Sequence, residues 1–355
     1  MKVISLFDGI SCGRVALERA GISVEHYAAF EIEEHAIAVG ERNWGGQYYH
    51  HYGDVITADF TMFKDYDLLI GGSPCQALST ANVYLKDGEY GVNGEGKSRL
   101  FWEFVRAYKT IQPKWFLYEN VASMKKEDKN IITKELGVEP VLINSILFSG
   151  QVRRRLYWTN IPFDVPNERM VDIELKDILE PSVPDWYYLK AGTVGYITRR
   201  NDKWVSKKME INPQYGRPVV ASCWKIHRAD TDSYVSTEYC PEGRTNIRRL
   251  TPTECERLQT LPDGYTIWTD DDISLAKMNR YRYEMIGNGW TVDVISHILK
   301  GIVKTESEVT EYRGSTYYLY NFNIYDAELN IFISEASNGF LDLFEYFEYF
   351  ETAQN

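Results

Sequence analysis

Cysteine is scarce in this sequence, and long apolar runs are missing. Its 355 residues contain five cysteines that form no CxxC pair, namely Cys12, Cys75, Cys223, Cys240 and Cys255. An odd number of scattered thiols argues against a disulfide framework and a zinc ribbon, so we expect single thiols and no metal site. No stretch approaches the roughly 20 apolar residues that span a bilayer, and the N-terminus begins with a strand-like run instead of a secretory signal. These absences predict a protein that stays inside the cell, away from membranes.

Basic residues are outnumbered, but their distribution is uneven. The net charge is −12, and residues 305–355 carry most of it, with ten acidic side chains against one arginine. Residues 188–250 hold twelve lysines and arginines against six acidic side chains. A basic segment in an acidic protein is a candidate binding site for a polyanion such as nucleic acid. On charge alone, a solvated loop region explains the same composition.

Residues 1–160 alternate short β-rich runs with helical stretches, which is typical of βαβ units. We therefore expect an α/β fold with a doubly wound, mostly parallel sheet. The expected strands cover residues 3–7, 26–32, 66–70, 115–118, 141–148 and 156–159, and the expected helices include 13–20, 33–43 and 98–111.

The middle of the chain departs from this pattern. Prolines interrupt residues 166–247 and no hydrophobic period is sustained there, so we assign this range to a second, smaller domain. The first domain, residues 1–160, then resumes over residues 248–304, where Thr251 and Pro252 have the residue types of a helix start. Residues 305–355 form an acidic, aromatic tail, which we expect to pack on the chain itself or on a second copy of it.

Ligands of an open parallel sheet bind beyond the carboxyl ends of its strands. The turn after the first expected strand lacks the GxGxxG pattern of a dinucleotide site, so a ligand without a pyrophosphate fits better. Glu31 is placed to accept both hydroxyls of a ribose, and Asp54 to accept from an adenine amino group. These positions predict a nucleoside ligand, and S-adenosyl-L-methionine is the common one without phosphates. A merely structural turn is the alternative.

Cys75 follows a Gly-Gly-Ser-Pro turn at the end of another expected strand. Such a turn presents the thiol at the ligand edge of the sheet, which suits a nucleophile. A small packed thiol is the alternative for a cysteine that stands alone. Glu119, however, ends the next apolar strand and is a candidate proton donor at the same edge.

The motifs of this chain, taken in order, resemble those of the DNA cytosine-5 methyltransferases. The resemblance runs to about residue 303 and rests on Phe7-Asp8-Gly9, Ser73-Pro74-Cys75-Gln76, Glu119-Asn120-Val121, residues 151–155, residues 248–259 and Gly287-Asn288-Gly289-Trp290. It implies a Rossmann-like, S-adenosylmethionine-dependent fold with a target-recognition domain at 166–247. Residues 6–10 and 99–104 look most like the animal de novo branch, but without its regulatory domains. We therefore expect a stand-alone bacterial or phage enzyme of the cytoplasm, of the restriction-modification type.

The family's chemistry implies four catalytic residues. Cys75 would add as a thiolate to carbon 6 of cytosine, which makes carbon 5 nucleophilic toward a methyl sulfonium. Glu119 would give ring nitrogen 3 a proton or a strong hydrogen bond. Arg153 and Arg155 would hold the cytosine carbonyl and lower the pKa of the thiol. Because a stacked base is out of reach of such a pocket, the cytosine must leave the duplex.

The resemblance also implies contacts to the cofactor and to double-stranded DNA. The cofactor contacts are Phe7, Asp8, Gly9, Ile10, Cys12, Glu31, Ile32, Asp54, Val55, Gly72, Asn288, Gly289 and Trp290. The nucleic-acid contacts are Ser73, Gln76, Arg199, Arg200, Lys203, Lys207, Lys208, Arg217, Lys225 and Arg228. The glycine-rich loop 77–97 would close on the DNA as a flap, with a plain surface loop as the alternative. An RNA (tRNA) cytosine-5 methyltransferase and a catalytically silent DNA-binding homologue remain alternative functions.

Overall fold

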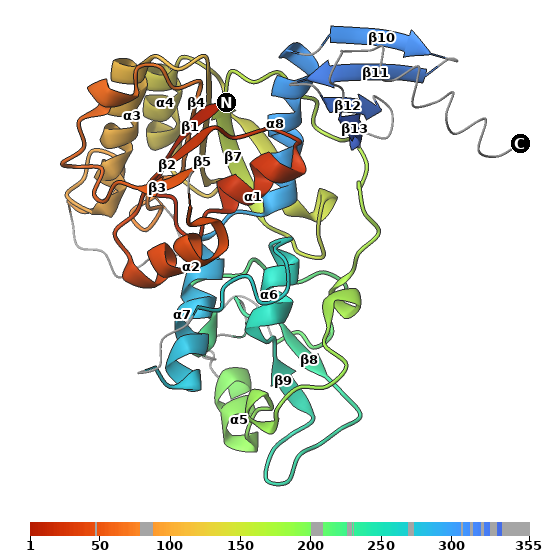
Figure 1. Ribbon diagram of the computed structural model, residues 1–355. Coiled ribbons are helices and arrows are strands. Elements are labelled where there is room, and N and C mark those ends of the chain that lie inside the picture. The colour runs from red at the N-terminus through yellow and green to blue at the C-terminus, as the bar shows by residue number, and fades with distance from the viewer. Residues whose placement is uncertain are drawn as a thin grey trace, which may run out of the picture.

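The computed structural model describes residues 1–306 apart from 47, 79–87, 200–208, 226–228, 230 and 269–272, and the backbone of four strands between residues 308 and 335. Within these residues, no helix is both long enough and apolar enough to cross a membrane. Figure 1 shows a sheet with its helices in the upper part of the molecule and a smaller region below it.

The upper part is built on a seven-stranded sheet in the order β3-β2-β1-β4-β5-β7-β6. Strands β1 to β5 pair in parallel, whereas β7 runs antiparallel to both of its neighbours. The predicted mostly parallel sheet is therefore confirmed. The strands are β1 (Lys2–Leu6), β2 (His26–Phe30), β3 (Tyr49–His51), β4 (Leu68–Gly71), β5 (Trp115–Val121), β6 (Val141–Asn144) and β7 (Arg154–Thr159).

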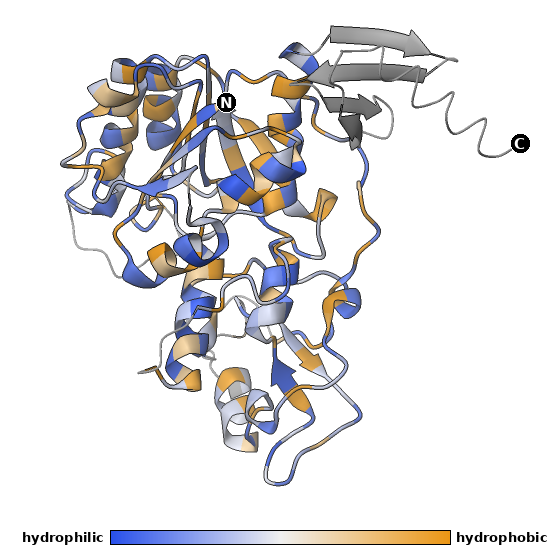
Figure 2. Cartoon of the chain, in the orientation of Figure 1, coloured by the Kyte–Doolittle hydropathy of each residue, from blue (hydrophilic) through white to orange (hydrophobic). Residues whose placement is uncertain are grey.

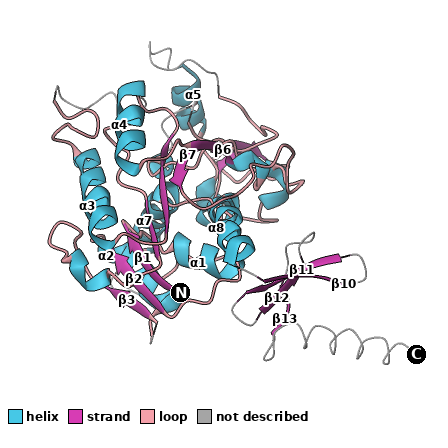
Figure 3. Cartoon of the chain, turned by 90° about the horizontal axis from the view of Figure 1, so that it is seen from above, coloured by secondary structure: helices cyan, strands magenta, loops and turns pink. Residues whose placement is uncertain are grey.

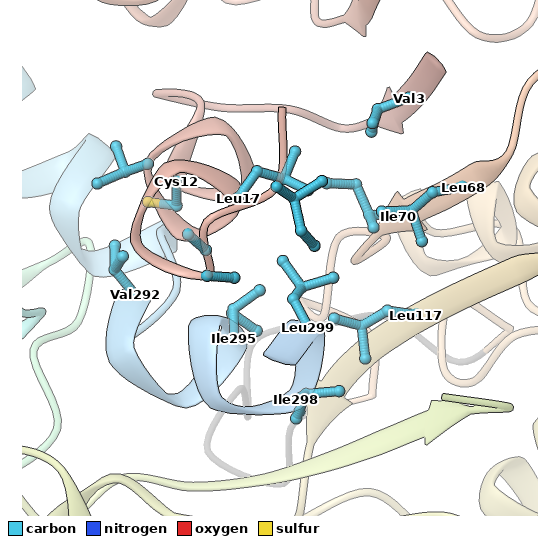
Figure 4. Packing of buried hydrophobic residues seen from close by; sticks show 14 of the residues in the cluster. Val3, Cys12, Leu17, Leu68, Ile70, Leu117, Val292, Ile295, Ile298 and Leu299 are labelled. Carbon is cyan, nitrogen blue, oxygen red and sulfur yellow. The ribbon is translucent and has the colours of Figure 1, made fainter. Parts of the chain in front are cut away.

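Helices cover both faces of this sheet (Figure 3). Alternate strand residues face opposite sides: Val3 packs with one cluster of buried residues and Ile4 with the other. The Val3 side is covered by α1 (Cys12–Arg19), α2 (Glu34–Trp44) and α8 (Val292–Glu306), and the Ile4 side by α3 (Phe101–Ile111) and α4 (Lys126–Leu136). Figure 4 shows Leu299 of α8 beside Leu117 of the sheet.

The smaller region combines residues from before and after position 250. Its core joins Leu175, Val219 and Val235 to Leu258 and Ile286. Its elements are α5 (Ala191–Arg199), β8 (Tyr234–Ser236), β9 (Ile247–Arg249), α6 (Pro252–Leu258) and α7 (Leu275–Asn288). Helices α6 and α7 supply part of this core. They therefore pack as one unit with the segment that precedes residue 250.

Helix α6 begins as its sequence predicts. Thr251 is the N-cap, Pro252 is the first helical residue, and Thr251 and Glu254 form a reciprocal capping box. The carboxylate of Glu254 also forms a buried ion pair with Arg248 at 2.7 Å. This pair fixes the entry of the chain from β9 into α6.

Beyond α8 the chain forms a separate antiparallel sheet of four strands in sequence order. These strands are β10 (Glu308–Tyr312), β11 (Ser315–Tyr320), β12 (Asn323–Asp326) and β13 (Phe332–Glu335). They lie at the far end of α8 from the smaller region (Figure 1). Figure 2 shows hydrophobic residues along the main sheet and α8, which together form the principal core.

Candidate active site

The turn of residues 72–76, which carries the predicted nucleophile Cys75 and is called the nucleophile turn for that reason, lies directly after β4, at the carboxyl edge of the sheet. The Ser73 hydroxyl lies 2.6 Å from the Tyr118 hydroxyl, and the Asn120 side chain donates to the Ser73 carbonyl at 3.2 Å. Both partners belong to the neighbouring strand β5. Ser73 is buried, so its hydroxyl holds the turn here, and its predicted contact to nucleic acid stays a prediction.

A second serine holds the turn from its other side. The Ser98 hydroxyl donates to the carbonyl of Pro74 at 2.7 Å, and the backbone N–H of Ala77 donates to Ser98 at 3.0 Å. These bonds span the residues on both sides of Cys75. The thiol is therefore presented by a turn that β5 and the segment before α3 fix independently.

Cys75 itself is partly buried. Burial raises the pKa of its thiol, the positive charge of Arg155 opposes that shift, and the negative charge of Glu119 adds to it. The net direction is upward, because desolvation of the thiolate outweighs the nearby guanidinium. The raised pKa favours the protonated thiol, and the positive charges of Arg155 and, to a smaller extent, Arg153 favour its ionisation.

Both carboxylate oxygens of Glu119 have partners. Arg155 Nε lies 2.9 Å from Oε1, and the indole Nε1 of Trp290 donates to Oε2 at 3.0 Å. Arg155 reaches Glu119 because β7 pairs antiparallel with β5, which sets Arg155 opposite Val121. Cys75, Glu119, Arg155 and Trp290 are therefore brought together from four separate segments of the chain.

Arg153 is buried, and its guanidinium bonds to the protein itself. It donates to the carbonyl oxygens of Val219 at 2.7 Å, Gly287 at 3.2 Å and Gly289 at 2.9 Å. Burial, and then the charge of Arg155, lower its pKa to about 9. In this structure Arg153 ties the hairpin of β6 and β7 to the smaller region and to the end of α7, and its predicted contact to cytosine stays a prediction.

The turn after β1 has an unusual backbone. Phe7, Gly9 and Ser11 all have positive φ, of 57°, 57° and 59°, a conformation that costs energy for residues other than glycine. Asp8 is buried behind the turn and accepts from the hydroxyls of Ser11 and Tyr27, each at 2.6 Å. Burial raises the pKa of Asp8 to about 6. Asp8 therefore supports the turn from within.

Glu31 ends β2 beside this turn. Its carboxylate accepts from the backbone N–H groups of Gly9 at 2.8 Å, Ile32 at 2.7 Å and Glu33 at 3.0 Å. The Ile32 side chain is 59% exposed at the same edge. The two predicted ribose positions, Glu31 and Ile32, thus carry a fixed carboxylate and an exposed apolar side chain.

The remaining predicted cofactor residues lie around the same edge. Asp54 accepts from the N–H of Ile56 at 2.9 Å, whereas Val55 is buried. Ile10 and Cys12 are also buried, and burial raises the pKa of the Cys12 thiol to about 12. A Cβ on Gly289 would lie 3.2 Å from Cys12 Sγ, so the segment of Asn288, Gly289 and Trp290 packs tightly on the start of α1.

Few of the predicted nucleic-acid contacts can be placed. Gln76 is exposed, Arg217 pairs with Glu210 at 3.5 Å, and Lys225 Nζ lies 5.4 Å from the ring centre of Trp224. The side chain of Arg199, together with Arg200, Lys203, Lys207, Lys208 and Arg228, lies outside the described residues, as do residues 79–87 of the expected flap. Among the described residues, no three His, Cys, Asp or Glu side chains gather in a group suited to a metal ion.

Sequence reasoning missed several residues that shape this site. Tyr118 and Ser98, which hold the nucleophile turn, were not among the expected site residues. Trp290 was expected as a cofactor contact, but its bond to Glu119, 171 positions away along the chain, was not. No short-range pattern signals such contacts. They arise only when the sheet is assembled.

The family model described as C-5 cytosine-specific DNA methylase matches residues 1–304. The chain is similar to Type II methyltransferase M.HpaII of Haemophilus parainfluenzae, with 28% identity over 336 residues, 85% of this chain and 88% of that protein. Orphan methyltransferase M.SPRI of Bacillus phage SPR is 34% identical over 194 residues, 51% of this chain and 42% of that protein. Among solved structures, the Entamoeba histolytica methyltransferase EhMeth aligns with a TM-score of 0.67 and 17% identity, over 87% of this chain and 99% of that one.

Proposed function

This chain belongs to the C-5 cytosine-specific DNA methylase family, and on that premise we propose how it works: it transfers a methyl group from S-adenosyl-L-methionine to carbon 5 of a cytosine flipped out of double-stranded DNA. The observation that carries the proposal is the convergence of Cys75, Glu119 and Arg155 at the carboxyl edge of the sheet. The cytosine-5 DNA methyltransferase activity is that of the family. The residues, the donor and the course of the reaction are what we propose for this chain.

The donor's site fits the residues after β1, β2 and β3. A Cβ on Gly9 would meet no atom within 4 Å, so there is open space beside the cofactor turn. Ile32 and Ile56 are 59% and 55% exposed and offer apolar surface to a planar base, while Glu31 offers a carboxylate to ribose hydroxyls. When bound, S-adenosyl-L-methionine supplies an electrophilic methyl group on a sulfonium. We assign its ribose to Glu31 and its adenine to Ile32, Asp54 and Val55.

Cys75 is the nucleophile in this proposal. Its thiol gives up its proton to solvent water, and the thiolate forms a bond to carbon 6 of the cytosine. The electron pair displaced from the double bond makes carbon 5 nucleophilic. Glu119 delivers a proton to ring nitrogen 3, which stabilises this adduct. After carbon 5 has accepted the methyl group, solvent water takes the proton from carbon 5, which restores the double bond and expels the Cys75 thiolate, and ring nitrogen 3 returns its proton to Glu119.

Arg155 links the two groups that exchange charge in this sequence. It pairs with the Glu119 carboxylate at 2.9 Å, and its charge lowers the pKa of the Cys75 thiol against the effect of burial. As Glu119 gives up its proton, the guanidinium stabilises the carboxylate that forms. Arg155 therefore stabilises two anions, the Cys75 thiolate and the Glu119 carboxylate that remains after proton transfer.

The target base must leave the duplex to reach this edge, at a cost of about a few kcal/mol. We assign recognition of the DNA to residues 166–247, in which Arg217 and Lys225 are the expected nucleic-acid contacts whose side chains the structure describes. Phosphate contacts from this segment predict binding that weakens steeply with salt.

Bisulfite sequencing of DNA from cells that express the protein tests this function. The wild type should methylate cytosines at a defined sequence, and Cys75→Ala should leave all cytosines unmethylated, because the variant cannot form the bond to carbon 6. Cys255→Ala, which removes a buried thiol from α6, should methylate as the wild type does. Methylation that persists in Cys75→Ala would refute the assignment of the nucleophile, and methylation confined to RNA would refute the substrate.

A further inference from the structure

Trp290 joins the segment after α7 to the catalytic carboxylate. Its indole Nε1 donates to Glu119 Oε2 at 3.0 Å, while Arg155 holds Oε1 at 2.9 Å. The carboxylate is therefore oriented by one charged and one neutral donor. An indole N–H only donates, so it fixes the oxygen without competing for the acid's proton.

Gly72 packs against this contact, and its lack of a side chain leaves room for the indole and the carboxylate. A Cβ on Gly72 would lie 3.0 Å from Glu119 Oε2 and 3.3 Å from Trp290 Nε1. Such distances are shorter than ordinary van der Waals contact. Only a glycine at position 72 therefore lets the indole and the carboxylate pack against the backbone here. Gly72 belongs to the turn that carries Cys75. The contact thus lies directly beside the nucleophile.

The backbone that carries Trp290 is itself held firmly. The Gly289 carbonyl accepts from Arg153 at 2.9 Å and from the Gln259 side chain at 3.0 Å. The Thr291 hydroxyl donates to the same Gln259 side chain at 2.8 Å. Because both neighbours of Trp290 are fixed by buried hydrogen bonds, the indole is preorganised before any ligand arrives.

We propose that Trp290 is a positioning residue for Glu119: its N–H sets the orientation in which the acid meets ring nitrogen 3 of cytosine. This role rests on the proposed function and goes beyond the cofactor contact expected of Trp290. The indole contributes to the step in which the adduct forms, apart from any contribution of its ring to binding the methyl donor. A donor that orients the acid should affect the rate of that step and leave donor binding largely unchanged.

Trp290→Phe tests this role, because phenylalanine keeps an aromatic ring and removes the N–H. We expect kcat for methyl transfer to DNA to fall roughly tenfold, the effect of losing one hydrogen bond to a charged group. The KM for S-adenosyl-L-methionine should stay within about twofold of the wild type, because the ring remains. Single-turnover rates would show that the loss lies in the chemical step.

Trp158→Phe is the matched control. The Trp158 indole donates to Thr133 at 3.0 Å on the α4 side of the sheet, so this variant loses an equivalent N–H away from the site. It should retain the wild-type kcat once thermal unfolding has shown that both variants are folded.

Three outcomes would overturn the proposal: an unchanged kcat in folded Trp290→Phe, a rise in KM for the donor with kcat unchanged, or an equal fall of kcat in both variants. A rise in KM for the donor with kcat unchanged would mean that Trp290 contributes to donor binding and does not position Glu119. A wild-type protein that methylates no DNA would instead refute the proposed function, before either variant is measured.

Discussion

Asp8 shows how a single buried carboxylate shapes the predicted cofactor turn. Its oxygens accept from the hydroxyls of Ser11 on the turn and Tyr27 on β2. Phe7 and Ser11, on either side of Asp8, both have positive φ, and such backbone persists only where surrounding contacts determine it. The hydrogen bonds of Asp8 supply those contacts, so this residue holds the strained turn against the sheet.

The stability of the protein should therefore depend on the charge of Asp8. Its pKa is raised to about 6 by burial, so the folded state binds a proton more tightly than the unfolded chain. The stabilisation is fully present below about pH 4 and is lost as the pH rises through 6. Relative to Asp8→Asn, which resembles the protonated acid at every pH, the wild type should lose roughly 2 kcal/mol of unfolding free energy between pH 4 and pH 7.

Urea unfolding of both proteins across this pH range measures that difference. Carboxylates elsewhere contribute equally to the two proteins and cancel in the comparison. Parallel stability curves would mean that Asp8 titrates alike in the folded and unfolded states.

At the residue scale, the sequence predicts the contacts that depend on strand order alone. Glu119 lies near the end of β5 and Cys75 follows β4, and parallel pairing of these strands brings the two residues to one edge. The partners of Glu119 were harder to predict from the sequence. Arg155 reaches Glu119 because β7 pairs antiparallel with β5, and Trp290 approaches from the end of α7. The buried bonds of Arg153 to three carbonyls depend on packing between segments, which no local pattern encodes.

At the scale of elements, the apolar strands and the helices α1, α2 and α3 were predictable from the sequence, and the shortest strand of the main sheet was not. β1, β2, β4 and β5 are nearly fully buried, and their apolar runs show in the sequence. The short edge strand β3 was not expected, because three partly polar residues give no period. The sequence therefore predicts the interior strands of the sheet better than its edge strand β3.

Helix α8 contains a glycine that packing demands. A Cβ on Gly301 would lie 2.0 Å from the carbonyl oxygen of Pro162 and 2.9 Å from Ile161 Cγ2. Gly301→Ala should destabilise the protein by roughly 1–3 kcal/mol, because backbone must shift to admit the methyl group. Helix propensity alone predicts the opposite sign, a gain of about 0.5–1 kcal/mol.

Gly192→Ala separates these two effects. Gly192 lies in helix α5, and a Cβ there would meet no atom within 4 Å, so propensity alone should act and stability should hold or rise. Thermal and urea unfolding would compare the two variants. An unchanged stability in Gly301→Ala would show that α8 can move away from Pro162 at little cost.

At the scale of the whole molecule, the family match and the charge divide the chain at nearly the same place. The match ends at residue 304, and helix α8 ends at Glu306, whose carboxylate accepts from the Trp115 indole at 2.7 Å and pairs with Lys114 at 2.6 Å. The acidic segment begins just beyond, with the four-stranded sheet β10–β13. The end of helix α8 is thus anchored to the start of β5, and the acidic segment follows this anchor.

Removing residues 307–355 should strengthen binding to DNA while methyl transfer persists. These residues carry nine acidic side chains and one arginine, so their removal changes the net charge from −12 to −4. Less negative charge repels the phosphates less, and the effect should fade with salt because the Debye length shrinks from about 30 Å at 0.01 M to about 8 Å at 0.15 M. Fluorescence anisotropy with a labelled duplex would give Kd for both proteins over this range of salt concentration.

Two outcomes would contradict this prediction. Weaker binding by the truncated protein at low salt would mean that the acidic segment supports DNA binding, for instance by self-association of the chain. Equal affinities at every salt concentration would mean that the charge of the segment lies too far from the DNA to act on it.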